Sequence, residues 1–291
     1  MGESQQTRDR CTVLLGIVTK DRADILPKSI ESALSQRGAS INVSVIDDGS
    51  KDKTAEIWQR FPSVEWTTSP ESRGYVAARN YWMKSAKEEF FVSLDDDAWF
   101  LRGDEIALAC ERMNADEQVG AIAFDILSPD RPTVRQRSEI TAVPTFVGCG
   151  HMVRLTAARE VGLYETNPGN YGVEEKDLCL RLLDAGYKII KLFGVHVWHD
   201  KTEIGRTFPS QYASGVCNDL VLTYRRTPLF LLPLALVAKF FQHVVAASRR
   251  DLTKSCWQGF RLFVRSLRSL RGTRKPVRFS TLRNFVRLGR A

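Results

Sequence analysis

The sequence is poor in features typical of secreted, disulfide-stapled or membrane-spanning proteins. Its six cysteines are widely spaced and include no C-x-x-C pair, which excludes a small disulfide framework and favours reduced thiols. The polar N-terminus leads into only a short apolar run, so we expect no signal peptide and a catalytic part that faces the cytoplasm. No internal repeat is present. The expectation is a folded, largely soluble body.

The composition is that of an ordinary globular protein, but its charge is uneven. Hydrophobic residues make up 43% and charged residues 26% of the 291 residues, enough for one large α/β domain and an appendage. Residues 201–291 contain 18 Lys and Arg against 3 Asp and Glu, a net charge of +15, whereas residues 1–200 carry a net charge of −7. We therefore predict two functional regions, a main domain over residues 10–205 and a basic helical extension over residues 206–291.

Strand-like apolar runs alternate with helical patterns along the first 200 residues. The run from Cys11 to Thr19 precedes a helical pattern from Asp21 to Arg37. The alternation continues with strands at 41–50, 64–69, 89–98, 119–127 and 187–193, and with helices at 54–60, 74–87, 103–114, 156–161 and 174–185. Residues 128–145 are rich in proline and charge, which predicts an irregular excursion. The pattern predicts a mostly parallel sheet flanked by helices, with ligands at the carboxyl ends of its strands.

Two acidic clusters fall at predicted strand ends. Asp95 and Asp97 project to the same side of an extended chain, and their hard oxygen atoms suit Mg²⁺ or Mn²⁺. A divalent cation held there would neutralise the phosphates of a nucleotide diphosphate as it leaves. Asp47 and Asp48 precede a glycine, where they can accept hydrogen bonds from a base or ribose. The alternative for each cluster is an acidic surface turn or a helix N-cap without a ligand.

Later carboxylates and imidazoles are candidates for proton transfer and metal binding. Glu174 and Glu175 begin a predicted helix, where one of them can serve as general base toward an acceptor hydroxyl. The alternative is a favourable pairing of acidic side chains with the helix dipole. A neutral imidazole, from either His196 or His199, can complete the coordination of a metal held by the aspartates.

Taken together, these motifs resemble glycosyltransferase family 2 over residues 12–200. The resemblance is carried by DDGS-x-D-x-T from Asp47, AARN from Ala77, LDDDA from Leu94, GCGHMVR from Gly148 and EEKDLCLR from Glu174. It implies the A-type glycosyltransferase fold, a nucleotide-sugar donor and inversion by direct displacement. No covalent sugar–enzyme intermediate is then expected, and no nucleophilic Ser or Cys is needed.

The resemblance also implies roles for individual residues. Asp95 and Asp97 match the metal-binding acidic pair of the family, and His199 matches its metal-binding histidine better than His196. Contacts with the nucleotide sugar are implied for six residues: Thr19, Asp47, Asp48, Arg79, Asp95 and Asp96. Glu175 falls at the position of the general base, which is usually an aspartate in the family, and Glu174 precedes it.

The basic extension contains two segments typical of membrane-surface helices. Residues 228–247 are strongly apolar but are interrupted by Lys239, Gln242 and His243, so we expect an interfacial or re-entrant segment rather than a full span. Apolar residues from Trp257 to Leu270 recur at helical spacing, with arginines largely off this stripe. Anionic lipid would attract such a tail and bring a lipid-linked acceptor to the enzyme. The alternative is a helix packed on the catalytic domain with a solvated basic face.

The sequence therefore predicts an inverting, metal-dependent glycosyltransferase of cell-surface glycan or polysaccharide synthesis. We expect it in the cytoplasm, peripheral at the inner face of the cell membrane. Two other classes remain open. A sugar nucleotidyltransferase would share the acidic strand ends, but no glycine-rich phosphate loop is evident near the N-terminus. A nucleic-acid-binding protein would explain the basic tail but not the acidic first 200 residues, so no nucleic acid partner is expected.

Overall fold

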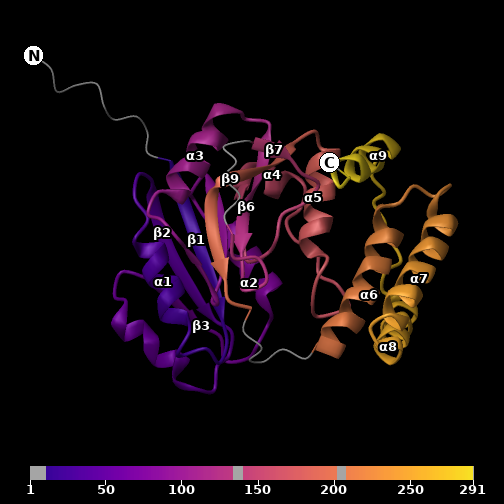
Figure 1. Ribbon diagram of the computed structural model, residues 1–291, viewed down its shortest axis with the longest axis horizontal. Coiled ribbons are helices and arrows are strands. Elements are labelled where there is room, and N and C mark those ends of the chain that lie inside the picture. Colours follow the sequence, from indigo (N-terminus) through magenta and orange to yellow (C-terminus); the bar gives the residue numbers. More distant parts are fainter. Residues whose placement is uncertain (1–10, 134–139, 202–207, 291) are drawn as a thin grey trace, which may run out of the picture. The chain divides into compact units, whose positions relative to one another are not determined.

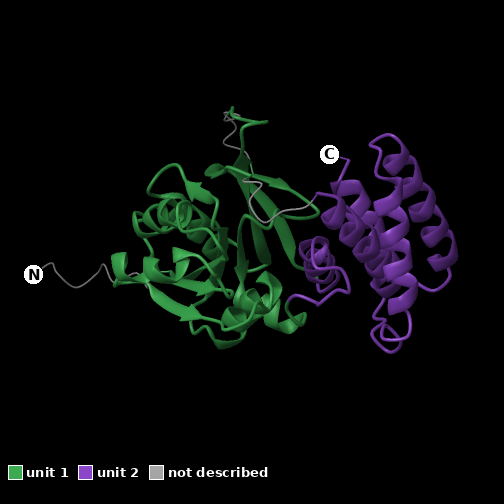
Figure 2. Cartoon of the chain, turned by 90° about the horizontal axis from the view of Figure 1, so that it is seen from below, with its two compact units in different colours: residues 1–163, 186–202 green, residues 164–185, 203–291 purple. Residues whose placement is uncertain are grey.

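The chain folds into two compact units. The computed structural model describes residues 11–133, 140–201 and 208–290. The first unit comprises residues 1–163 and 186–202, and the second comprises residues 164–185 and 203–291 (Figure 2). The predicted boundary between residues 205 and 206 lies outside the described residues. The second unit also takes in residues 164–185, which the sequence pattern placed with the catalytic domain.

The first unit is built on a sheet whose predicted strands pair in parallel. β1 (Thr12–Thr19) lies between β2 (Ser40–Asp47) and β4 (Phe90–Asp95), and β3 (Glu65–Thr68) pairs with β2. β6 (Val119–Leu127) and β9 (Lys188–His199) form a second parallel pair. These strands are the apolar runs of the sequence, so the predicted α/β architecture is confirmed (Figure 1).

Three short strands, which the sequence pattern did not predict, pair antiparallel and make the sheet mixed. β8 (Gly150–Arg154) lies between β4 and β6, whereas β5 (Ala98–Phe100) and β7 (Ile140–Ala142) pair with β9. β7 falls in the predicted irregular excursion, of which residues 134–139 lie outside the described residues. Segments of 3 to 5 residues offer too few alternating positions for a periodicity signal.

Helices cover both faces of this sheet. α1 (Leu26–Leu34) and α3 (Glu105–Ala115) bury apolar residues in one core with alternate residues of β1, such as Leu15. α2 (Tyr75–Ser85) lies on the opposite face, because a side chain at Gly16 would come within 2.5 Å of the Trp82 ring. α4 (Leu155–Glu160) follows β8.

Two of the predicted helices differ in the structure. α1 begins at Leu26 rather than at Asp21, because Asp21 adopts a left-handed φ of 52° and Pro27 occupies the first turn of the helix. Lys53–Arg60 forms a 3₁₀ helix rather than an α-helix. Both segments adjoin the carboxyl ends of β1 and β2, where the chain turns toward the predicted site.

The expectation of reduced thiols is wrong for one pair of cysteines. Cys11, directly before β1, and Cys110 of α3 form a disulfide across a sequence separation of 99 residues. Spacing along the chain cannot reveal such a pair, because only the packing of α3 on the sheet brings the two residues together. The other described cysteines, Cys149, Cys179, Cys217 and Cys256, are buried.

The second unit is helical. Its elements are α5 (Glu174–Asp184), α6 (Phe208–Arg226), α7 (Leu232–Ser248), α8 (Thr253–Ser266) and α9 (Phe279–Leu288). α6, α7 and α8 lie side by side and share a core that includes Val216, Leu220 and Phe260 (Figure 1). Among the described residues, no helix has both the length and the apolar character needed to cross a membrane.

The predicted apolar stripe from Trp257 to Leu270 is divided between core and surface. Phe260, Phe263 and Leu270 are buried in the core shared with α6, whereas Trp257 and Val264 are exposed. Only the exposed part of the stripe is therefore available to a membrane surface. Its buried part packs on helices of its own unit, because those helices expose a complementary apolar face.

Candidate active site

The parallel register brings the predicted acidic clusters to one edge of the first unit's sheet. Thr19 of β1 pairs with Asp47 of β2, and Val18 of β1 pairs with Asp95 of β4. Because these strands run in the same direction, their carboxyl ends meet, which is where ligands bind in sheets of this kind. The two acidic clusters therefore lie at one edge, as the sequence pattern predicts.

Asp95, Asp97 and His199 form a cluster that can hold a metal ion. The short strand β5 follows the aspartates and pairs with β9 so that Ala98 lies opposite His199. One ligand atom from each of the three residues lies within 4.8 Å of the others. Asp97 Oδ1 and His199 Nε2 are 3.2 Å apart, and the Asp97 side chain is buried. Two carboxylates and an imidazole suit Mn²⁺ or Mg²⁺, and His196 does not belong to this cluster.

Arg79 of α2 holds Asp95 in place. Its Nη2 atom donates hydrogen bonds to Asp95 Oδ1 at 3.2 Å and to the carbonyl oxygen of Gly148 at 3.0 Å. The guanidinium carbon lies 4.9 Å from the centre of the Tyr75 ring. Arg79 is buried, so its charge is fixed beside the acidic cluster. Its predicted contact with a nucleotide sugar stays a prediction.

Arg22 is a second buried cation beside the cluster, and the sequence pattern did not single it out. Its Nη1 atom lies 3.6 Å from Asp97 Oδ2 and 3.9 Å from Asp96 Oδ1. The backbone of Arg22 is fixed by a 2.8 Å hydrogen bond from its amide to Thr54 Oγ1. Burial raises the pKa of Asp96 to about 7, although the charge of Arg22 opposes this shift. A single arginine after a strand carries no sequence signal of such a position.

Asp47 and Asp48 have different environments at the end of β2. Both carboxylate oxygens of Asp48 accept hydrogen bonds from residues 72–74, the longest at 2.9 Å, so Asp48 fixes the entry to α2. Asp47 Oδ1 accepts a 2.9 Å hydrogen bond from the amide of Ser50, while its Oδ2 atom is buried without a hydrogen-bond partner. A buried oxygen without a hydrogen-bond partner is available to accept a hydrogen bond from a ligand, as a nucleotide hydroxyl or amino group would donate. The nucleotide contacts of both residues, and of the buried Thr19, stay predictions.

The two candidates for the general base lie in the second unit, at the start of α5. Glu174 is buried, whereas Glu175 is half-buried. The helix follows two residues with left-handed backbone, Gly172 with φ of 84° and Val173 with φ of 82°. A positive φ is unusual for a β-branched residue, and such strain persists only where the surroundings enforce it.

Asn218 of α6 holds the backbone before α5 in this left-handed conformation. Its side-chain amide donates hydrogen bonds to the carbonyl oxygens of Gly169, Tyr171 and Gly172, at distances from 2.9 to 3.1 Å. Its Oδ1 atom accepts a 2.9 Å hydrogen bond from the amide of Gly169. The loop directly before α5 is therefore anchored to α6. A lone asparagine far along the chain shows no pattern from which this role can be predicted.

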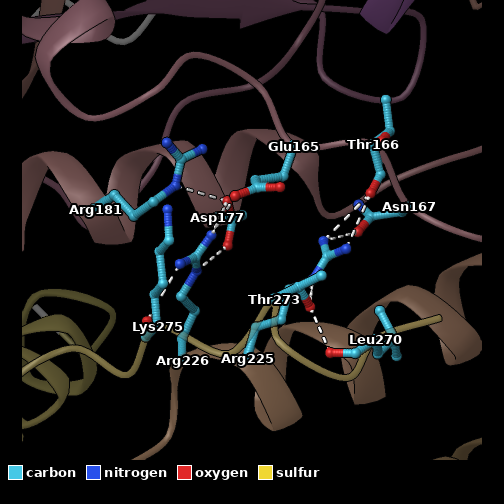
Figure 3. A network of polar contacts seen from close by, with 10 residues as sticks. All are labelled: Glu165, Thr166, Asn167, Asp177, Arg181, Arg225, Arg226, Leu270, Thr273 and Lys275. Carbon is cyan, nitrogen blue, oxygen red and sulfur yellow. Dashed lines mark hydrogen bonds and ion pairs between the residues drawn. The ribbon is translucent and has the colours of Figure 1, made fainter. Parts of the chain in front are cut away.

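Asp177 fixes the first turn of α5 through a buried arginine of α6. Arg226 Nε lies 2.5 Å from Asp177 Oδ1, and Arg226 Nη2 lies 3.1 Å from Asp177 Oδ2 (Figure 3). Arg181 Nε donates to Asp177 Oδ2 at 2.8 Å, and Arg226 also pairs with Glu165 at 3.2 Å. Arg226 is 1% exposed and Asp177 is buried, so the pair between them is shielded from water. The helix that carries Glu174 and Glu175 is thus held by charges as well as by apolar packing.

Comparison with known proteins identifies the family. Residues 15–162 match the model of glycosyl transferase family 2, a segment that contains the acidic strand ends described above. The chain belongs to glycosyltransferase family 2. An uncharacterized glycosyltransferase of Rickettsia typhi is 23% identical over 216 residues, which are 68% of this chain and 64% of that protein. The succinoglycan biosynthesis protein ExoO of Rhizobium meliloti is 31% identical over 126 residues, 42% of this chain and 36% of that protein. The family 2 chain therefore matches less than two thirds of the length of either curated relative.

A solved structure supports the fold. The mannosyltransferase PcManGT of Pyrobaculum calidifontis, in complex with GDP-Man and Mn²⁺, superposes with a TM-score of 0.60. The match covers 96% of this chain and 79% of the mannosyltransferase at 17% identity. At this identity the likeness shows the fold alone, and it confirms the predicted A-type glycosyltransferase fold.

Proposed function

We propose that this family 2 chain is an inverting glycosyltransferase, which moves a sugar from a nucleotide-diphosphate donor to an acceptor hydroxyl. The observation that carries the proposal is the cluster of Asp95, Asp97 and His199 at the acidic end of the parallel strands. The similar fold of a mannosyltransferase solved with GDP-Man and Mn²⁺ supports a nucleotide sugar and a divalent cation as ligands.

On the donor side, Asp95, Asp97 and His199 would hold Mn²⁺ or Mg²⁺. The cation supplies charge neutralisation for the departing diphosphate. The residues that would contact the nucleotide sugar are Thr19, Asp47, Asp48, Arg79, Asp95 and Asp96. Arg22 and Arg79 hold the carboxylates at fixed positions before a ligand binds, which lowers the reorganisation that binding requires.

On the acceptor side, Glu175 would remove the proton from the attacking hydroxyl. Direct displacement needs one carboxylate that an acceptor can reach, and Glu175 is more exposed than the buried Glu174. Asn218 and the strained backbone of Val173 fix the start of α5, which suits a side chain that must be oriented for proton transfer. Glu174 would then support the turn rather than act on the acceptor.

The acceptor is proposed to be a glycan or a lipid-linked glycan of a cell-surface polysaccharide, used at the inner face of the cell membrane. The similarity to a succinoglycan biosynthesis protein supports this class. The basic C-terminal region, with a net charge of +15 over residues 201–291, supports association with an anionic membrane surface. We further assign catalysis to residues 10–205 and membrane association to residues 206–291.

A thermal-shift experiment on the full chain tests the donor side. Nucleoside diphosphates and their sugars should raise the unfolding temperature only when Mn²⁺ or Mg²⁺ is present, because a ligand that binds the native state stabilises it. Slow metal-dependent release of nucleoside diphosphate from one donor sugar should accompany the shift. A protein that shows neither effect with any common nucleotide would overturn the proposal.

Assays of the same protein with other ligands separate the competing functions. A sugar nucleotidyltransferase would respond to a nucleoside triphosphate with a sugar phosphate and would release pyrophosphate. A nucleic-acid-binding protein would bind oligonucleotides with a steep salt dependence and would leave nucleotide sugars intact.

A further inference from the structure

Helix α7 exposes an apolar stripe along its length. Leu234, Val237, Phe241 and Val245 recur at helical spacing and are 70%, 53%, 60% and 47% exposed. In the turn before the helix, Leu229 and Phe230 are each 73% exposed. The stripe is therefore about 16 Å long at 1.5 Å per residue, and its apolar side chains face solvent rather than the core.

The charged residues that interrupt this segment in the sequence lie on the opposite side of the helix. Lys239 Nζ lies 2.8 Å from Asp219 Oδ2 of α6, and His243 Nε2 lies 3.0 Å from the same oxygen. Lys176 of α5 pairs with the other oxygen of Asp219 at 3.3 Å. Of the three polar residues at positions 239, 242 and 243, only Gln242 is exposed. The outer face of α7 is thus nearly uninterrupted, which the linear sequence does not reveal.

The neighbouring face of α8 supplies positive charge. Phe240 of α7 stacks on Phe260 at 4.8 Å and contacts Trp257 at 6.1 Å between ring centres, so Trp257 borders α7. Arg261 follows Trp257 by one helical turn on the same face, Arg268 lies in the turn after α8, and both are exposed. Asp251 is the one acidic residue in positions 229–272. Apolar and basic side chains with a single acidic residue among them match a surface of anionic lipid.

We propose that the outer face of α7, with the adjoining face of α8, docks in the interface of an anionic bilayer. Leu234, Val237 and Phe241 insert among the headgroups and upper acyl chains, while Arg261 and Arg268 meet lipid phosphates. The proposal rests on the proposed membrane association and assigns it to one surface. A second copy of the chain is the competing occupant. It is disfavoured because the second unit contains 19 Lys and Arg against 8 Asp and Glu, so two such faces repel one another.

Flotation of the full chain with vesicles tests this surface. Truncation after Arg226 is unsuitable, because it would expose the core that α7 and α8 form with α6. The outer-face variant is Leu234→Ser with Phe241→Ser. Its matched control is Leu34→Ser with Val286→Ser, which removes two apolar side chains that are 42% and 50% exposed elsewhere on the chain. The charge variant is Arg261→Gln with Arg268→Gln.

The wild-type protein should float with phosphatidylcholine vesicles that contain phosphatidylglycerol, and far less with phosphatidylcholine alone. The outer-face variant should bind roughly 10-fold more weakly or worse, because about half of the buried apolar area is lost. The charge variant should lose about fivefold per arginine at low salt and little at high salt. The control pair should float like the wild type.

Equal flotation of the outer-face variant and the wild type, with matching unfolding temperatures, overturns the proposal. So does a concentration-dependent dimer that the outer-face variant abolishes while neither protein floats, since the occupant is then a second copy. Metal-dependent nucleotide binding on the same preparations reports the proposed function separately. Flotation without nucleotide binding supports the surface and contradicts the transferase proposal. Nucleotide binding without flotation supports the transferase proposal and contradicts the proposed membrane-docking surface.

Discussion

The two units of this family 2 chain hold their charged side chains in different ways. In the first unit, strand register places acidic residues at one edge of a sheet whose core is almost entirely apolar. In the second, an ion pair joins two helices in the interior, where Arg226 and Asp177 lie between α5 and α6. A largely buried pair of the first unit, Asp125 with Lys191, instead joins neighbouring strands. We therefore expect the sheet to keep its fold without its site carboxylates and the helical unit to depend on its ion pairs.

The difference follows the charge balance of the units. The first unit contains 23 Lys and Arg against 26 Asp and Glu, and the second contains 19 against 8. Acids are therefore scarce in the second unit, and two of its buried acids have several cationic partners: Asp177 pairs with Arg181 and Arg226, and Asp219 pairs with Lys176, Lys239 and His243. Removing one such acid or its main partner leaves uncompensated charge.

The largest expected effect concerns the edge of the first unit's sheet. Asp97→Asn should abolish metal-dependent nucleotide binding and lower kcat/KM by about 10³-fold or more, because a metal ligand is lost. Thermal shift with Mn²⁺ and a steady-state assay measure the two effects. Glu111→Gln, an exposed carboxylate on α3, is the matched control and should change neither.

The unfolding temperature without ligand should be nearly unchanged in Asp97→Asn, because the lost pair with Arg22 is offset by relief of the repulsion between Asp97 and Asp96, and Arg22 keeps Asp96 as a partner. A variant that unfolds easily but still binds nucleotide with unchanged metal dependence would reverse the comparison between the units. Asp97 would then be a structural residue of the sheet.

The second prediction concerns the interior of the helical unit. Arg226→Met should lower the free energy of unfolding by about 3–5 kcal/mol, because Asp177 would remain buried without its main partner. Urea denaturation measures this loss. Arg283→Met, an exposed arginine of α9, should change the free energy by less than about 0.5 kcal/mol.

Adding Asp177→Asn to Arg226→Met should restore part of the loss, since the uncompensated charge disappears with it. If Arg226→Met proves neutral on its own, apolar packing rather than ion pairing holds the second unit, and the contrast with the first unit fails.

The elements that could be predicted are those with long periodic patterns. β1, β2, β4 and β6 are largely apolar runs, and their parallel pairing follows from the alternation with helices, whereas β9 was predicted only over residues 187–193 and extends to His199. β5, β7 and β8 escaped prediction because they are short and their pairing is decided by neighbours distant in sequence. The Cys11–Cys110 disulfide escaped for the same reason.

The residues of the site divide in the same way into those that the sequence predicts and those that it does not. Asp95 and Asp97 could be recognised from their spacing at a strand end, and His199 from the family resemblance. Arg22 and Asn218 carry no pattern, because each acts through contacts that only the tertiary fold creates. The inward orientation of Lys239 and His243 is of the same kind: in the sequence they interrupt an apolar run, and in the structure they leave its outer face apolar.

The third prediction concerns the proposed base. Glu175→Gln should lower kcat roughly 10²-fold with donor affinity nearly unchanged, because the loss of a base is felt in the transition state. Glu174→Gln is the matched variant, and its effect should be on stability rather than on kcat, since Glu174 is buried. A large loss of kcat in Glu174→Gln with an active Glu175→Gln would move the base by one residue.

The smallest expected effect is a change with pH in the stability that Asp219 gives to the second unit. Burial alone would raise the pKa of Asp219, but the hydrogen bond from His243 and the charges of Lys176 and Lys239 hold it well below its ordinary value of 3.8. A carboxyl group with a lowered pKa in the folded state adds stability that is fully present above the unfolded pKa and is lost as the pH falls through the folded pKa.

Asp219→Asn should therefore be less stable than the wild type by about 1–3 kcal/mol between pH 5 and pH 7. The difference should shrink by about 1 kcal/mol when the pH is lowered to 3, because the unfolded wild-type chain then takes up a proton that the folded chain excludes. Urea denaturation across this pH range measures the difference. Asp251→Asn changes an exposed carboxylate of the same unit and should have little effect at any pH. A gap between Asp219→Asn and wild type that stays constant down to pH 3 would mean that Asp219 contributes by shape and hydrogen bonding, and that its charge does not hold α7 to α5 and α6.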